Sequence, residues 1–115
     1  MTRNPDKIIN IVCHVTGVSI DDIKRSVYGT GQRDCQNCID ARQIAMFFIK
    51  ELNPQIPHEQ IAIMFNKRLK NGKGDHVISS HACKVSRDYI ETQDEKYLTL
   101  LNKVYKALNG RIGIK

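Results

Sequence analysis

Hydrophobic positions recur along the chain at spacings of three and four residues, which is the pattern of helices packed on one side. The first such stretch covers 5–16, where Asn4 and Pro5 supply a cap and a first turn. Ser19 is in position to cap a short second helix that ends near residue 29. Residues 29–37 show no periodicity and contain glycine, aspartate and asparagine, so they predict an exposed loop.

The middle of the chain is more uniformly apolar. Residues 38–52 are hydrophobic on nearly every side of a helix, which predicts a helix at the centre of the domain. Prolines end this segment, and Pro57 suits the first turn of another helix, expected over about 57–68. A basic connector with two glycines, KRLKNGKG, follows at 67–74.

Two further helices complete the pattern. Asp75 is in position to cap a helix over about 75–90, and Thr92 with Glu95 forms a capping box for the last helix, which ends at Asn109. The apolar positions predicted to face the core from 75–90 are Ile78, Ala82, Val85 and Tyr89. The sequence therefore predicts an all-α single domain of about six helices, with a flexible tail at 109–115.

Composition agrees with a globular protein, since 41% of the 115 residues are hydrophobic and 26% are charged. The longest apolar run is too short to cross a membrane, and the amino terminus does not read as a signal peptide, so we expect a cytoplasmic location. Four cysteines without an export signal predict free thiols.

The positive charge is concentrated in one segment. The chain carries +6 overall, and residues 67–84 hold five basic residues against one acid, Asp75. A focused positive field favours a polyanion such as nucleic acid. A helix, a basic connector and a second helix with a polar first half form the arrangement of a helix-turn-helix, here expected over about 57–90.

The candidate DNA contacts fall into two groups by chemistry. Lys67, Arg68, Lys70 and Lys73 would attract phosphates without regard to sequence. The side chains expected on the outer face of the second helix, and so able to reach base edges, are His76, Ser79, Ser80 and Lys84. The pattern by itself is also compatible with an ordinary amphipathic helix.

Three blocks of the sequence, ARQIAMFFIKEL at 41–52, QIAIMF at 60–65 and DHVISSHACK at 75–84, support a more specific hypothesis. Their order and spacing resemble the carboxy-terminal DNA-binding domain, domain IV, of the bacterial replication initiator DnaA, over about residues 7–108. The resemblance implies a helical TrpR/DnaA-domain-IV-like fold that binds specific double-stranded DNA sites through a recognition helix and a basic loop. It also implies a nucleoid-associated role at a replication origin, in regulating replication initiation, or in transcription.

The resemblance assigns roles to individual residues. Asp75 and His76 match the pair that opens the family's recognition helix, which implies contacts with base edges or phosphates. Arg42 and Gln43 match an arginine and a glutamine that touch the phosphate backbone. His81 matches a later histidine that also lies near the backbone.

The minor-groove arginine of the family's basic loop has Arg33 as its nearest counterpart here, with Arg25 as the rival. This chain departs from the family at three positions that bear on base recognition. Gly74 stands where an arginine usually precedes the Asp-His pair, and Val77 and Ile78 replace two hydroxyl residues. Each good base contact is worth roughly 1–3 kcal/mol of discrimination, so we expect DNA binding with a different target sequence.

Other functions receive less support from the sequence. There is no GxxxxGK[ST] motif, so neither nucleotide binding nor ATP hydrolysis is expected, and no cofactor is implied. Cys35 and Cys38 form a CxxC pair that leaves zinc binding as an alternative, although no second pair lies at a compact spacing. Cys83 and His81 are two apart on a helix and point to different sides, which argues against a nucleophile–base pair and an enzyme.

A protein-interaction module is the remaining alternative. The last helix has a heptad-like series of apolar residues that would serve either a partner or the domain's own core. We expect it to pack within the domain and the protein to be a monomer, with self-association left open.

Overall fold

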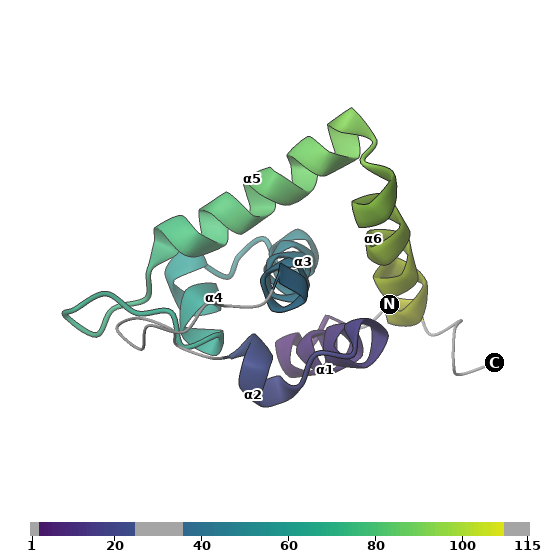
Figure 1. Cartoon of the computed structure of the whole chain (residues 1–115). Coiled ribbons are helices and arrows are strands. Elements are labelled where there is room, and N and C mark those ends of the chain that lie inside the picture. The colour runs from purple at the N-terminus through teal and green to yellow at the C-terminus, as the bar shows by residue number, and fades with distance from the viewer. Residues whose placement is uncertain (1–2, 25–35, 110–115) are drawn as a thin grey trace.

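Six α-helices, without a strand among them, lie in the residues that the computed structural model describes, 3–24 and 36–109 (Figure 1). The predicted all-α class is confirmed. The first helix, α1 (Pro5–Thr16), begins after Asn4, whose side chain accepts hydrogen bonds from two backbone N–H groups. The second, α2 (Ile20–Ile23), begins after Ser19 as predicted but ends well before residue 29.

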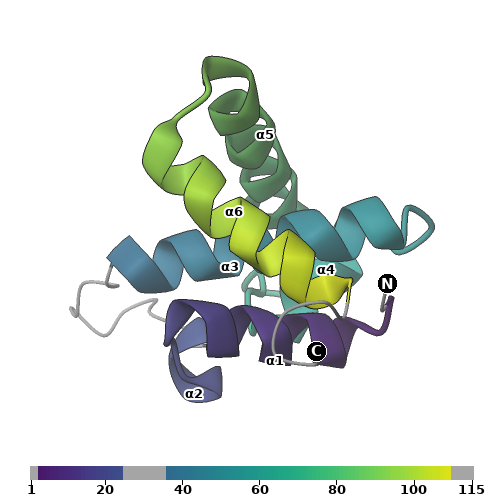
Figure 2. The same ribbon diagram turned by 90° about the vertical axis from the view of Figure 1, so that its right-hand side faces the viewer.

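The central helix is α3 (Gln36–Leu52), which starts two residues earlier than expected. Residues 44–49 are all buried, as the nearly continuous apolar pattern predicted. α1 and α5 (His76–Thr92) pack against α3 from two sides, and α2 and α4 (His58–Met64) pack against it as well. α6 (Glu95–Leu108) folds back to pack on α1 (Figure 2).

The end of α4 and the cap of α6 also differ from the prediction. α4 ends at Met64 and not near residue 68, since the chain turns at Phe65 and Asn66, the latter with a positive φ of 59°. α6 is capped by Asp94, whose carboxylate accepts a hydrogen bond from the N–H of Tyr97 at 2.9 Å. Thr92 cannot act as this cap because it still belongs to α5, where its hydroxyl donates to a backbone carbonyl.

The buried side of α5 is rotated from the one predicted. Its fully packed residues are small: Ser79, Ala82, Cys83 and Ser86. Of the predicted stripe only Ala82 is buried, while the larger side chains beside it are half-buried. Small side chains let α5 approach the helices beneath it closely, and the two buried hydroxyls are satisfied there by His58 and Tyr97 at 2.8 and 2.7 Å.

Candidate nucleic-acid interface

The connector between α4 and α5 forms a small hairpin. We call residues 68–74 the basic hairpin. Arg68 and Gly74 pair as an antiparallel bridge, and the N–H of Leu69 donates to the carbonyl of Lys73 at 2.7 Å. The turn is closed by a bond of 2.9 Å from the N–H of Gly72, which has a φ of 86°, to the carbonyl of Leu69. Figure 1 shows the hairpin projecting beyond the helices at the start of α5.

The base of the basic hairpin is fixed against both helices. The N–H of Asp75 donates to the carbonyl of Lys67 at 2.9 Å, which joins the two ends of the connector. Gly74 is buried against α4, and a Cβ atom there would collide with the backbone carbonyl of Glu59. This contact explains why glycine stands where the resemblance leads one to expect arginine, since no side chain fits at this position.

Five hairpin side chains face solvent, namely Arg68, Leu69, Lys70, Asn71 and Lys73. The guanidinium of Arg68 donates to the carbonyl of Gly72 at 2.9 Å, so this cation also holds the hairpin in shape. Lys67 is different, because only 4% of it is exposed and it has interactions within the chain. The prediction that Lys67 lies at the surface with the other cations is wrong.

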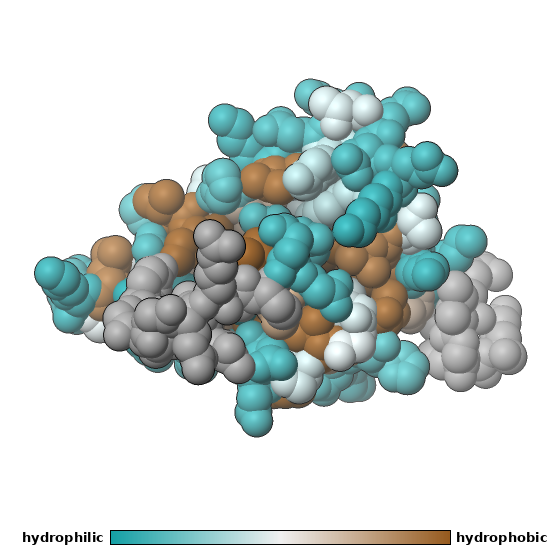
Figure 3. All heavy atoms as spheres, viewed as in Figure 1, coloured by the Kyte–Doolittle hydropathy of each residue, from teal (hydrophilic) through white to brown (hydrophobic). Residues whose placement is uncertain are grey.

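The outer face of α5 consists of residues spaced by three and four. Val77, Ser80, His81 and Lys84 are all exposed and follow one side of the first three turns. His76, the first residue of the helix, is exposed beside them. Figure 3 shows hydrophilic side chains at the outer end of the basic hairpin and hydrophobic ones between that end and α5. The exposed residues of the basic hairpin and these residues of α5 form one surface, which we call the hairpin–α5 surface. Its α5 residues are His76, Val77, Ser80, His81 and Lys84.

Ser79 does not belong to this surface. It is fully buried, and its hydroxyl lies 2.8 Å from Nδ1 of His58 at the start of α4. The prediction that Ser79 faces solvent, where it would meet base edges, is therefore wrong. Its position follows from the rotation of α5, which turns residue 79 toward α4 and leaves Ser80 outside.

Asp75 and His58 have defined local roles at the start of the two helices. Asp75 caps α5, and its carboxylate accepts a hydrogen bond from the N–H of Val77 at 3.2 Å. The pKa of His58 is lowered, chiefly by burial and further by the positive charges of Lys50, His76 and Arg87. The carboxylate of Glu59 acts in the opposite direction, and Arg87 is itself paired with Glu51 at 3.0 Å, so the charges around the α4–α5 junction are mixed.

Arg42 serves the fold and not the surface. It is 6% exposed, and its Nε and Nη2 atoms donate to the carbonyls of Ile23 and Asp22 at 2.8 and 3.1 Å. These carbonyls end α2, so the guanidinium caps that helix from α3. The expectation that Arg42 reaches a phosphate is wrong because its donors point into the protein. Gln43 is half-buried in the next position of α3.

The predictions for the loop and for the tail fall outside the described residues. This applies to Arg33 and Arg25 as candidates for the minor groove, to Cys35, and to residues 110–115. Cys38 is disulfide-bonded, so the prediction of a free thiol is wrong at this position.

Two described cysteines are free thiols, Cys83 buried and Cys13 half-buried. Cys83 is 2% exposed, as expected, and burial raises its pKa; burial also raises the pKa of Cys13. Catalytic thiols have lowered pKa values, so neither thiol is activated by its surroundings. Within residues 3–24 and 36–109, no three His, Cys, Asp or Glu side chains come together as metal ligands. No helix in these ranges has the length and apolar character needed to cross a bilayer.

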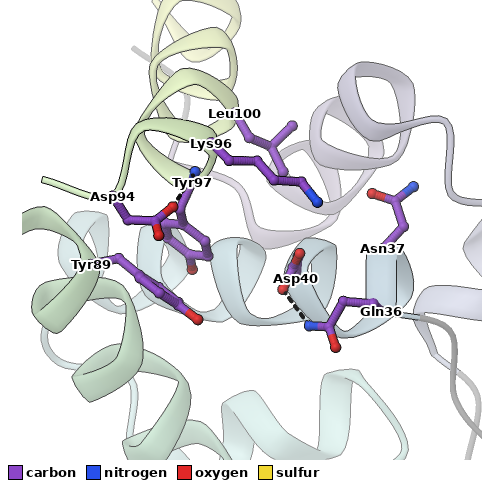
Figure 4. A pocket seen from close by; sticks show the side chains of 8 residues that line it. All are labelled: Gln36, Asn37, Asp40, Tyr89, Asp94, Lys96, Tyr97 and Leu100. Atoms are coloured by element: carbon purple, nitrogen blue, oxygen red, sulfur yellow. Dashed lines mark hydrogen bonds between the residues drawn. The ribbon is translucent and has the colours of Figure 1, made fainter.

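A hollow of about 510 Å³ lies between the start of α3, the end of α5 and the start of α6 (Figure 4). The rings of Tyr89 and Tyr97 stack beside it with centroids 4.3 Å apart. Its carboxylates already have partners, because Asp40 accepts a hydrogen bond from Gln36 and Asp94 caps α6. The hollow is at the opposite end of α5 from the basic hairpin, so it is separate from the hairpin–α5 surface.

The last helix packs within the domain, as expected. Leu101, Val104 and Leu108 of α6 are buried, and α6 packs against α1. Tyr105 stays 48% exposed. The apolar repeat of this helix is therefore largely used by the core of this chain.

The chain matches no family model, no curated protein and no solved structure in the three comparisons with known proteins. The description of the hairpin–α5 surface therefore rests on the positions and exposure of its own residues. Sequence reasoning located most of its polar members but missed Val77 and Leu69, which are 59% and 43% exposed. The signal for Val77 was its spacing of three, four and seven residues from Ser80, His81 and Lys84.

Proposed function

We propose that this protein binds double-stranded DNA sequence-specifically, with α5 as the recognition helix and the basic hairpin as a phosphate contact. The observation on which this rests is that the outer face of α5 and the cationic hairpin are exposed next to each other. They are joined at their base by the hydrogen bond from Asp75 to Lys67.

The charge of the hairpin–α5 surface suits a polyanion. Arg68, Lys70, Lys73 and Lys84 are exposed, whereas Asp75, the acid in 67–84, is half-buried and turned to the helix cap. Exposed cations gain affinity for DNA by releasing the counterions of the phosphates they meet. Such a contact is strong at low salt and weak at high salt.

The shape also suits a duplex. A major groove about 12 Å wide accepts an α-helix, and the first turns of a recognition helix are the ones that meet base edges. His76, Ser80, His81 and Lys84 supply hydrogen-bonding groups on these turns. The basic hairpin precedes them directly, so it would meet the phosphates at the edge of the same groove.

The resemblance to domain IV of DnaA supports the same function and suggests its setting. We propose a stand-alone protein of this kind without an ATPase, which acts at a replication origin, in the regulation of initiation, or in transcription. The burial of Ser79 and the glycine at 74 change the base-contacting set, so its target sequence is expected to differ from that of the initiator.

The salt dependence of binding tests this proposal. Affinity for a labelled duplex, measured by fluorescence anisotropy, should fall steeply with salt concentration. Replacing Lys70 and Lys73 together by alanine should reduce the slope of log K against log salt by up to about 1.8, because each phosphate contact contributes about 0.9. The loss should be similar for unrelated duplexes, since phosphates carry no sequence information.

A matched pair of lysines provides the control. Lys103 and Lys106 are exposed on α6, away from the hairpin–α5 surface, and their joint replacement by alanine changes the net charge equally. This variant should keep the wild-type slope. Equal slopes for both double variants, or no duplex binding at low salt, would contradict the proposal.

A further inference from the structure

Val77 has an unusual position for a large apolar residue. It is 59% exposed, more than any other large hydrophobic side chain among the described residues. It lies in the first turn of α5, in line with Ser80, His81 and Lys84. Of the two apolar groups in the hairpin–α5 surface, Leu69 lies in the hairpin, and Val77 lies on α5 at the leading end of the polar row.

The site of Val77 is held firmly. Its own N–H is bonded to the cap Asp75, and the next turn is fixed by the buried contact of Ser79 with His58. Valine has essentially one χ1 rotamer in a helix, so its two methyl groups have a defined direction. Little side-chain entropy remains to be lost when they meet a ligand.

The major groove offers one kind of partner for such a group. Its base edges present hydrogen-bond donors and acceptors, and the C5 methyl group of thymine is the apolar exception. Serine, histidine and lysine can pair with the polar edges, but Val77 gains nothing from them. We propose that Val77 selects a thymine in the bound site by contact with its C5 methyl group, an inference that rests on the DNA-binding function proposed above.

The expected effect is modest and measurable. Burying one methyl-sized group is worth about 0.8 kcal/mol, which corresponds to about a fourfold change in affinity. Uracil differs from thymine in lacking this methyl group and pairs with adenine in the same way. Replacing thymine by uracil therefore removes the contact while leaving the hydrogen-bonding pattern of the groove unchanged.

The experiment starts with selection of bound duplexes from a random pool. In the best duplex, each thymine is replaced by uracil in turn, and the affinities of the wild type and of Val77→Ala are measured. The wild type should lose about fourfold at one position. Val77→Ala should bind the thymine and uracil duplexes equally at that position.

Ile90→Ala is the matched control, since Ile90 is also an exposed apolar residue of α5, 38% exposed, but lies near its other end. It should keep the wild-type preference for thymine. Three outcomes refute the role of Val77 and leave the proposed DNA binding standing. In the first, the wild type binds the selected duplex but does not prefer thymine over uracil at any position. In the others, the preference for thymine survives in Val77→Ala, or it is lost in both Val77→Ala and Ile90→Ala. Failure of the wild type to enrich or bind any duplex instead refutes DNA binding itself.

Discussion

Arg42 offers the sharpest separation between a structural and a DNA-contacting residue. In the structure its guanidinium caps the carboxy-terminal end of α2 through the carbonyls of Ile23 and Asp22. Arg42→Met keeps most of the apolar stem but removes both donors. We expect it to destabilise the fold while leaving the DNA affinity of the folded protein unchanged.

The expected loss in the free energy of unfolding of Arg42→Met follows from the two hydrogen bonds. A bond to a charged donor is worth about 1.5–3 kcal/mol, and the bond to Ile23 is buried. The bond to Asp22 is partly buried, so water can replace it at a cost of roughly 0.5–1.5 kcal/mol after the change. The sum is about 2–4.5 kcal/mol. For a domain of this size that lowers Tm by about 10–20 °C.

Thermal unfolding followed by circular dichroism measures the first effect, and the salt slope of duplex binding below Tm measures the second. Lys84→Met is the control, because Lys84 is exposed on the outer face of α5. It should keep Tm but weaken binding to the preferred duplex, because Lys84 is among the residues proposed to meet base edges. The assignment of Arg42 is refuted if Arg42→Met keeps the wild-type Tm, or if it lowers the salt slope.

Two other predictions concern the packing of α5. Gly74→Ala should destabilise the protein by about 1–3 kcal/mol and weaken duplex binding, because its Cβ meets the carbonyl of Glu59. Gly72→Ala is the control: its Cβ would lie in open space, but its φ of 86° strains the variant and should cost about 1 kcal/mol of stability. Equal urea midpoints for the two variants would contradict the contact between Gly74 and Glu59. Burial raises the pKa of Tyr97 to about 12, so the folded state holds this proton more tightly than the unfolded chain, and stability should fall as pH rises from about 10 to about 12. Tyr97→Phe should cost about 1 kcal/mol of stability at neutral pH, because it loses the hydrogen bond to Ser86. The free energy of unfolding of this variant in urea should also fall less steeply with pH above about 10 than that of the wild type. The same pH dependence in both proteins would show that Tyr97 ionises freely.

The sequence alone determined the helices and several of their ends. Asn4, Ser19 and Asp75 act as caps where they were expected, because a cap depends only on the backbone N–H groups of the next turn. The buried central helix was also visible, because apolar side chains on every side leave it no surface to expose to water. The concentration of positive charge before α5 likewise needed no structure.

Tertiary contacts decided which polar side chains are available at the surface. Ser79 and Ser80 are chemically identical, yet one is buried against His58 and the other is exposed, because the rotation of α5 depends on which small side chains fit against its neighbours. Arg42 is taken up by the end of α2, which lies about twenty residues away along the chain. The basic hairpin depends on the close approach of Gly74 to Glu59. Local patterns specify the helices because their hydrogen bonds are local, whereas these contacts join residues whose meeting depends on how the helices pack.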